Sequence, residues 1–183
     1  MSGSSRGPND PGRRDRIIEA ALDVIAEHGV RGATQRRIAD AAGVPLGSVT
    51  YHFEGGQELL VEAFTRLAET VSARYREPLE AAETVEEARA AVVEIICGGS
   101  VWGSPRELVL SYELYAFASR NPALLDVIRA WMAASRASLS RHFDARTARA
   151  LDALVEGLSI HNSMDAEPMS RQDVAAVVRA VSS

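Results

Sequence analysis

Apolar residues recur at three- and four-residue steps along almost the whole of this 183-residue chain. In the segment from Arg13 to His28 they fall on one side of a helix, and the later segments show the same period. No stretch alternates apolar and polar residues between turn residues, as a half-buried strand would. The pattern therefore predicts an all-α fold.

Glycine, proline and asparagine divide this pattern into separate helices. Gly29 is expected to end the first helix as a left-handed cap, and Pro78 to end the fourth. Thr34 is a candidate N-cap of the second helix, and Pro45 suits the first position of the third. The expected helices span residues 13–28, 35–42, 45–54, 57–76, 84–97, 105–119, 122–143, 145–164 and 170–181.

Charge is distributed unevenly along the chain, whose formal net charge is -5. Residues 1–53 carry seven Arg against six Asp and Glu, whereas residues 54–183 carry thirteen Arg against nineteen. This asymmetry suits a DNA-binding head on an acidic body, although many proteins that bind no nucleic acid show as much. Residues 1–12 are rich in Ser, Gly, Pro, Asn and Asp, and we expect them to form a flexible arm.

The segment from Gln35 to Val49 has the spacing of a helix-turn-helix. Ala39 is small enough for two helices to cross closely, and Gly43 tolerates the positive φ of a tight turn. The residues expected in the core beside the first helix are Ile38, Val44 and Val49. The residues left on the opposite face of the third helix, free to enter a major groove, are Leu46, Gly47, Ser48, Thr50, Tyr51 and His52. The spacing also fits a turn between two packed helices that never touch DNA.

Residues 13–60 resemble the N-terminal domain of regulators of the tetracycline-repressor (TetR) family. The matching pieces are Ile17-Ile18-Glu19-Ala20-Ala21, Gly29, Thr34, Ile38-Ala39, Ala42-Gly43-Val44, Gly47-Ser48-Val49, Tyr51-His52-Phe53 and Glu58-Leu59-Leu60. This ungapped resemblance covers about a quarter of the chain. The remainder is similar to the family only in length and helical character.

The resemblance implies roles for the matching surface residues. Thr34 and Gln35 would hold a phosphate at the start of the second helix, and Arg36 would reach a phosphate or a guanine edge. Tyr51 and His52 would contact phosphate or sugar. The residues expected against base edges are Leu46, Gly47, Ser48 and Thr50.

Two positions depart from the family pattern. Gly56 stands where many members carry a lysine that grips a phosphate, and Thr50 stands where many carry tyrosine. We therefore expect fewer direct DNA contacts. Arg37 is expected to face solvent or to pair with Asp40.

Residues 57–183 are expected to supply dimerisation and sensing, because a single helix-turn-helix binds too weakly to find its site. The helix over residues 57–76 is the only element that joins the two parts in sequence. The resemblance implies a homodimer in which helices 122–143 and 145–164 form a four-helix bundle with their mates. Small residues, which permit close helix approach but are also good helix formers, are dense there: Ala130, Ala133, Ala134, Ala137, Ala148, Ala150, Ala153 and Gly157.

Aromatic residues gather in the central third of the chain and suggest a partly apolar effector pocket. The candidates are Trp102, Tyr112, Tyr115, Phe117 and Trp131, with Glu113, His161 and Asn162 as polar candidates. Plain core packing is the alternative for each aromatic residue. His161 fits a dimer interface equally well.

No catalytic, cofactor or metal site is recognisable. The four histidines are scattered without metal-ligand spacing, and Gly-rich phosphate loops and nucleophile elbows are absent from the sequence. Cys97 is the only cysteine, which excludes an intrachain disulfide. Because the sequence has no secretory signal and no membrane-spanning run, we expect a cytoplasmic location. Because it lacks the catalytic and metal-binding motifs named above, we expect no enzymatic activity.

The sequence thus predicts a flexible arm (1–12), a three-helix helix-turn-helix head (13–56) and a C-terminal helical ligand-binding and dimerisation bundle (57–183). The expected function is that of a DNA-binding transcriptional repressor, which a small-molecule effector releases from a palindromic operator. The alternative is a helical DNA-binding dimer with no small-molecule effector.

Overall fold

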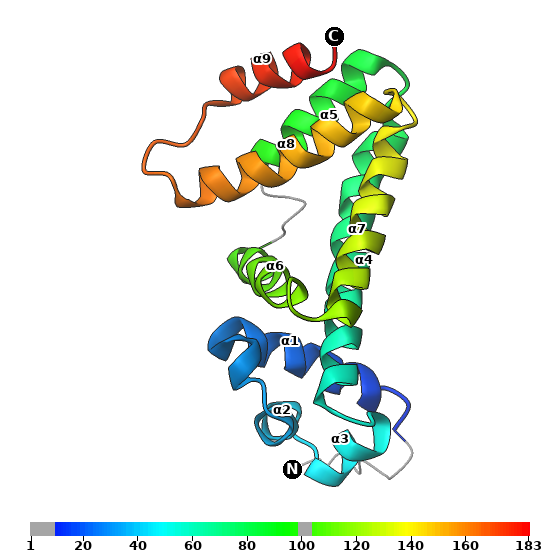
Figure 1. Cartoon of the computed structure of the whole chain (residues 1–183), viewed down its shortest axis with the longest axis vertical. Coiled ribbons are helices and arrows are strands. Elements are labelled where there is room, and N and C mark those ends of the chain that lie inside the picture. The colour runs from blue at the N-terminus through cyan, green and yellow to red at the C-terminus, as the bar shows by residue number, and fades with distance from the viewer. Residues whose placement is uncertain (1–9, 99–103) are drawn as a thin grey trace, which may run out of the picture. The chain divides into compact units, whose positions relative to one another are not determined.

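The computed structural model describes residues 10–98 and 104–183, which form nine α-helices and no strand (Figure 1). The predicted all-α fold is therefore confirmed. The helices are α1 (Arg13–Gly32), α2 (Gln35–Ala42), α3 (Leu46–His52), α4 (Gly56–Ala81), α5 (Val85–Cys97), α6 (Pro105–Ala118), α7 (Pro122–Leu139), α8 (Ala145–Met164) and α9 (Arg171–Val181).

The chain divides into two compact units. The first unit combines the residues up to Arg66 with Val109–Leu124, and the second combines Leu67–Leu108 with Leu125–Ser183. Most of α6 therefore belongs to the first unit, although the sequence analysis placed it in the C-terminal bundle. The functional boundary after residue 56 stays a prediction.

The core of the first unit is centred on α1. Ile17 and Ile25 are completely buried, and the side chain of Ile38 on α2 is 1% exposed. α1 packs against α2, and α2 packs against α3. The apolar stripe predicted on the first helix thus packs against α2, which in turn packs against α3.

α1 kinks at Gly29 instead of ending there. Gly29 has φ 68° and ψ 168°, a combination that essentially only glycine adopts, and helix resumes for one more turn to Gly32. The kink leaves the Val30 N–H without a partner in its own helix, and the Glu113 carboxylate accepts it at 2.8 Å. Glu113, expected in a pocket, therefore caps a helix turn within the first unit.

Three further predicted helix boundaries are wrong. Pro78 lies inside α4, which continues to Ala81. The continuation is stabilised by the complete burial of Leu79 and by His142, whose Nε2 donates to the Leu79 carbonyl at 2.7 Å. These contacts outweigh the one helix hydrogen bond that a proline removes.

The other two errors concern α7 and α3. α7 ends at Leu139 rather than Phe143, because the chain tightens into a turn in which the His142 N–H donates to the Leu139 carbonyl, three residues back, at 3.0 Å. Pro45 is the N-cap of α3 rather than its first residue. Both errors are local, and the order of elements is unaffected.

In the second unit α5 packs against α8 and α9, and α8 packs against α9. Thr84 begins α5 with a capping box completed by Glu87, and Ser170 caps α9. Arg89 donates to the Ser182 carbonyl at 2.6 Å, which joins α5 to the residues after α9.

Two further kinds of feature are missing from the described ranges. No helix there has the length and apolar content needed to cross a bilayer. No group of three or more His, Cys, Asp or Glu side chains there is placed to hold a metal ion.

Candidate nucleic-acid interface and internal cavity

A helix-turn-helix in the first unit is built from α2, a short turn and α3. Thr34 caps α2, since its Oγ1 accepts the Arg37 N–H at 3.3 Å. Gly43 lies in the left-handed region at φ 62° and ψ 39°, and Val44 donates its N–H back to the Ala39 carbonyl at 3.0 Å. Hydrogen bonds at both ends of α2 therefore fix the direction in which the chain enters α3.

The inner sides of both helices are fully buried. Ile38 and Ala39 on α2 are each 1% exposed, and Val49 on α3 is 0% exposed. Val44, in the turn, is half-buried. Ile38, Val44 and Val49 are the three positions that the sequence predicted as core. The small Ala39 lies where α2 and α3 cross, so the two helices are packed together rather than joined by a flexible loop.

The outer side of α3 carries the residues expected to contact bases and sugar. Tyr51 is 84% exposed and Leu46 is 39% exposed, so both side chains are accessible to a partner. The Tyr51 and His52 rings meet edge to face with centroids 5.1 Å apart. Gly47 and Thr50 are exposed, and Ser48 is half-buried. The surface is small and uncharged, with one projecting aromatic ring.

Two arginines near the start of α2 are exposed and differ in their partners. Arg36 makes no hydrogen bond or ion pair with the described residues, so its guanidinium is available to a phosphate or a base. Arg37 faces solvent, as one of the two expected alternatives has it, and its Nη1 donates to the Gly32 carbonyl at 2.6 Å; the other alternative, a pair with Asp40, does not form among the described residues. Gln35, beside them, is half-buried.

The sequence analysis did not select Arg31. It is exposed in the last turn of α1 and has no hydrogen-bond or ion-pair partner in the described part of the chain. A basic residue in the last turn of a helix is expected from the helix dipole alone, so the sequence did not mark Arg31 as a candidate for binding phosphate.

Gly56 is exposed as the first residue of α4. A Cβ built on it meets no atom within 4 Å. There is room at this position for the lysine that many family members carry, but glycine cannot make the phosphate contact of that lysine.

Charged side chains fix the start of α4 against α1. Arg14 pairs with Glu62 at 2.8 Å, and its guanidinium carbon lies 5.2 Å from the centre of the Phe53 ring. Arg66 pairs with Asp15 at 2.7 Å. Because Phe53 directly follows α3 and is buried, these contacts hold the C-terminal end of α3 in place.

Two helices joined by a glycine turn, with a buried inner face and an exposed second helix, form a helix-turn-helix, the motif that many proteins insert into the major groove of DNA. The family model of the bacterial regulatory proteins of the tetR family matches residues 17–63. The model of the tetracyclin repressor-like C-terminal domain matches residues 80–183. The chain belongs to the TetR family of bacterial transcriptional regulators.

Several solved structures resemble this chain over nearly its full length. A putative transcriptional regulator from Streptomyces coelicolor A3(2), SCO7518, is 45% identical, with 94% of this chain and 99% of that chain covered and a TM-score of 0.89. The multidrug binding protein EbrR in complex with ethidium is 31% identical, with 93% and 99% covered and a TM-score of 0.77.

Some curated relatives match about a third of the chain, and others match more than nine-tenths of it at 24–25% identity. The transcriptional repressor KstR2 of Rhodococcus jostii is 36% identical over 66 residues, which are 36% of this chain. The matched region spans 32% of the length of that repressor, about a third.

The predicted ligand-binding residues are divided between the two units. Tyr112, Tyr115 and Phe117 lie half-buried on the part of α6 in the first unit. Trp131 and His161 belong to the second unit, where Trp131 is 7% exposed and His161 is exposed. Trp102 lies outside the described residues. Only Trp131 of this set lines a cavity described within one unit.

That cavity lies inside the second unit, between α4, α7 and α8. Its lining consists of Val71, Tyr75, Trp131, Ser135, Asp152, Val155 and Glu156. Asp152 is 6% exposed, and its Oδ2 accepts from Arg136 Nε at 2.8 Å. Burial nevertheless raises the pKa of Asp152 above its ordinary value, against the lowering effect of Arg136.

Tyr75 is the second polar group that the sequence analysis missed. It is 4% exposed, and its hydroxyl has no hydrogen-bond partner among the described residues. Burial, and then the charges of Asp152 and Glu156, raise the pKa of Tyr75 well above its ordinary value. Its spacing along the helix indicates only an apolar stripe, and no neighbour in sequence shows that the Asp152 carboxylate lies near it.

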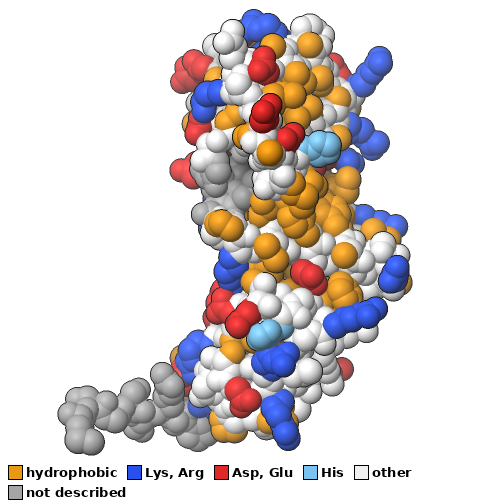
Figure 2. Space-filling view, turned by 90° about the vertical axis from the view of Figure 1, so that its left-hand side faces the viewer, with side chains coloured by type: hydrophobic (Ala, Val, Ile, Leu, Met, Phe, Trp, Pro, Cys, Tyr) orange, Lys and Arg blue, Asp and Glu red, His pale blue; other side chains and the backbone are white. Residues whose placement is uncertain are grey.

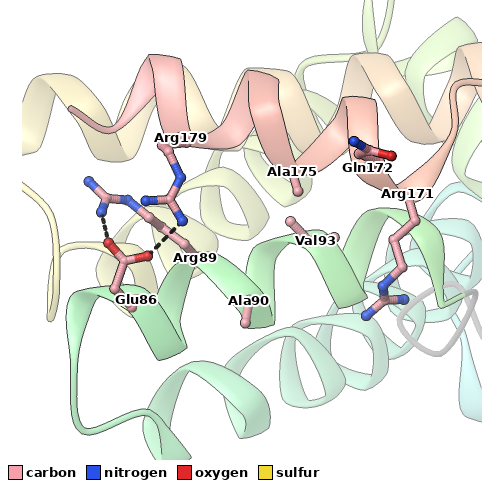
Figure 3. Close-up of a pocket in the computed structure, with 8 residues that line it drawn as sticks. All are labelled: Glu86, Arg89, Ala90, Val93, Arg171, Gln172, Ala175 and Arg179. Carbon is pink, nitrogen blue, oxygen red and sulfur yellow. Dashed lines mark hydrogen bonds and ion pairs between the residues drawn. The ribbon is translucent and has the colours of Figure 1, made fainter.

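A larger hollow of about 540 Å³ opens at the surface between α5 and α9 (Figure 3). Its apolar floor includes Ala90, Val93 and Ala175. Arginines at its rim are already paired, since Arg179 bonds Glu86 at 3.0 Å and Arg89 bonds the same carboxylate. This hollow therefore offers little uncompensated charge to a ligand.

Proposed function

We propose that this regulator is a repressor that binds a palindromic DNA operator as a homodimer and is released by a small-molecule effector. The observation that carries the proposal is the exposed outer face of α3, where Tyr51 and Leu46 project from a helix locked by its buried inner face. The unpaired Arg36 beside it supplies the charge that phosphate binding needs. KstR2 and AcnR, two of the curated relatives, are repressors by name.

The homodimer is supported by the surface of the second unit. Hydrophobic side chains gather on the upper part of the molecule in Figure 2, where α8 and α9 lie in Figure 1. Met164 is 68% exposed, Met169 is 39% exposed and Ala153 is exposed. Isolated apolar side chains on a surface mean little, but α8 also carries Gly157, which permits close approach of a second helix. We propose that α7 and α8 carry the interface.

Structural relatives support the proposal that a small molecule controls this regulator. EbrR structures contain imidazole, proflavin, ethidium and malachite green. The second unit of this chain has a polar cavity of about 10 Å³, room for one water, so a ligand of that kind would have to widen it. Tyr112, Tyr115, Phe117 and His161 remain predicted ligand-binding residues, and Trp131 is the predicted residue that we place in the site.

The test is a mobility-shift titration of the full chain against its own upstream intergenic DNA, with and without a panel of small molecules. Retention of a defined fragment, and its release by at least one compound, is the expected result. Binding that no compound weakens would favour the alternative, a DNA-binding dimer without an effector. No binding to this DNA or to a random-sequence library would overturn the assignment of α3 as the reading helix.

A further inference from the structure

The last turn of α1, residues 30–32, leaves the line of the helix at Gly29. Gly29 has φ 68° and ψ 168°, far from the values of an α-helix, so the residues on either side of it no longer share one helical face. Glu27 and Arg31 have the i, i+4 spacing at which a carboxylate pairs with a following basic residue on a straight helix. Glu27 Oε1 instead lies 3.7 Å from His28 Nε2, and no ion pair joins it to Arg31, although the structure describes both residues.

Other helices of the chain do make pairs of this kind. Arg129 bonds Asp126 at 2.9 Å on α7, and Arg76 lies 3.9 Å from Glu80 on α4. The Arg31 side chain has the sequence spacing for such a pair but no hydrogen-bond or ion-pair partner among the residues that the structure describes. The kink therefore leaves its guanidinium exposed and without a countercharge.

Three contacts hold the last turn of α1 in place. Glu113 on α6 accepts the Val30 N–H at 2.8 Å, and Arg37 on α2 donates to the Gly32 carbonyl at 2.6 Å. The turn also packs closely on the body of α1, because a Cβ at Gly32 would stand 2.7 Å from the His28 Cβ. The backbone of this turn is thus fixed by contacts from three helices of the first unit.

The last turn of α1 adjoins the start of α2, where phosphate contacts are already expected. Arg31 stands three residues before Thr34, the N-cap of α2, and Arg36 stands two residues after it. Because Arg37 ties the two segments together, both unpaired guanidiniums flank the same end of the helix-turn-helix. Phosphates follow one another along a DNA strand at about 3.4 Å of helix axis, so a second cation here can reach a neighbouring phosphate.

We propose that the DNA-contacting surface extends from α2 onto the last turn of α1, where Arg31 binds a backbone phosphate. The proposal rests on the proposed DNA-binding function and adds a contact outside the helix-turn-helix. The guanidinium offers a planar pair of N–H donors to phosphate oxygens, and no carboxylate among the described residues pairs with it. Because a phosphate carries no sequence information, Arg31 adds affinity for any duplex and no preference for the operator.

The test is a mobility-shift titration of the full chain at several salt concentrations. Two probes are used, its own upstream intergenic DNA and a random-sequence duplex of the same length. Arg31→Ala should lower the slope of log affinity against log salt by about one for each phosphate contact that is lost. It should weaken binding to the two probes by the same factor.

Arg31→Lys and Arg120→Ala are the matched variants. Lysine keeps a cation for the phosphate, so the slope of Arg31→Lys should stay close to that of the parent. Arg120 is also exposed in the first unit, and its side chain has no ion pair among the described residues. It follows α6, which lies on the opposite side of α1 from α3 in Figure 1, so Arg120→Ala should match the parent at every salt concentration. Thermal unfolding without DNA shows whether each variant keeps its fold.

Glu113 tests the role of the kink as a positioning residue. Glu113→Ala removes the acceptor of the Val30 N–H, whereas Glu113→Gln keeps an oxygen that can accept it. Glu113→Ala should lower the slope by part of the amount that Arg31→Ala does, and Glu113→Gln should restore it. The double variant with Arg31→Ala should lose no more slope than Arg31→Ala alone, because Glu113 acts only through Arg31. Additive losses would overturn this positioning role.

The remaining outcomes separate the proposal from the function on which it rests. An unchanged slope for Arg31→Ala, in a parent that binds DNA, overturns the contact and leaves the proposed function intact. A loss confined to the intergenic DNA overturns the phosphate assignment, because Arg31 would then read a base. An equal loss for Arg120→Ala overturns it as well, because any positive charge of the unit would then do the same. A parent that binds neither probe overturns both proposals.

Discussion

Two described glycines, Gly29 and Gly43, have positive φ, and they differ in how strictly they need to be glycine. Gly43, at φ 62° and ψ 39°, lies in the left-handed helical region that asparagine also adopts. Gly29, at φ 68° and ψ 168°, lies where a Cβ is almost never found. A Cβ on Gly29 would also stand 3.4 Å from both oxygens of Glu113.

Gly29→Ala should therefore lower the free energy of unfolding by about 1–3 kcal/mol. Gly43→Asn should change it by less than about 1 kcal/mol, because asparagine tolerates that conformation. Urea denaturation of both variants beside the parent measures the difference. An equal loss at the two positions would contradict the argument from ψ.

A second prediction at this scale concerns phosphate contacts. Arg36→Ala should remove one contact and Gly56→Lys should add one, so the slope of log affinity against log salt should decrease and increase, respectively, by about one. The lysine has open space at the start of α4, although a cation there is mildly unfavourable to the helix dipole. Mobility-shift titrations at several salt concentrations give both slopes.

Arg76→Ala is the matched control for this pair. Arg76 is exposed on α4 in the second unit, where its 3.9 Å pair with Glu80 is weak. Its slope should equal that of the parent. Parallel slopes for Arg36→Ala and the parent would remove Arg36 from the interface.

At the scale of elements, the sequence predicts best what local chemistry decides. Thr34, Gly43 and Asp144 mark helix ends through hydrogen bonds that lie within a few residues, and α8 begins and ends where the pattern predicts. Pro78 misleads because the contacts that carry α4 past it come from Leu79 and His142, sixty-three residues apart. The same reason hides the internal cavity: Tyr75 and Asp152 are distant in sequence, and only packing brings them together.

The N-cap of α8 gives a pH-dependent prediction. The Asp144 carboxylate accepts the Thr147 N–H at 2.9 Å, the Thr147 hydroxyl at 3.0 Å and the Arg146 N–H at 2.8 Å, and these bonds hold the pKa of Asp144 below its ordinary value. Because the folded pKa is depressed, the stabilisation is present above the unfolded value and is lost as pH falls through the folded one.

Asp144→Ala should therefore lower the melting temperature at pH 7, and the difference from the parent should shrink as pH falls below about 4. Asp144→Asn keeps an oxygen for the cap but does not titrate. It should stay close to the parent at pH 7 and lack this part of the pH dependence. Melting curves from pH 2.5 to 7 test all three proteins; a pH-independent difference for Asp144→Ala would argue against the carboxylate as the stabilising group.

At the scale of the whole molecule, assembly decides whether two reading helices can act together. A palindrome places two half-sites about one helical turn, roughly 34 Å, or a multiple of it apart, which a two-fold dimer can match. Ala153→Arg would put an unpaired charge into the proposed seam of α8. Since Ala153 is exposed in the single chain, the fold of each protomer should survive.

Light scattering at micromolar concentration should find a dimer for the parent and a monomer for Ala153→Arg. Ala116→Arg, an exposed alanine on α6, is the control and should stay dimeric. Mobility shifts should show weaker operator binding only for the monomeric variant. A monomeric parent would contradict the proposed assembly.

The coupling of effector to operator is the last property of the whole molecule. The sequence analysis made the helix after residue 56 the only element joining head and body, but α4, α6 and α7 each contribute residues to both compact units. A change in the second unit therefore has three covalent routes into the first. A ligand shifts an equilibrium only by its different affinity for two states, so an effector that releases DNA must bind the operator complex more weakly.

We expect negative coupling of about 1–3 kcal/mol, which is roughly 5- to 150-fold in affinity. Linkage requires the operator to weaken effector binding by the same factor that the effector weakens operator binding. The measurement is a closed cycle of four titrations: each ligand into free protein and into the complex with the other, followed through tryptophan fluorescence or labelled DNA. Effector dissociation constants that are equal with and without operator would show that the molecule binds but does not induce. In that case the sensing role would be lost, while the DNA-binding surface on α3 would stand on its own evidence.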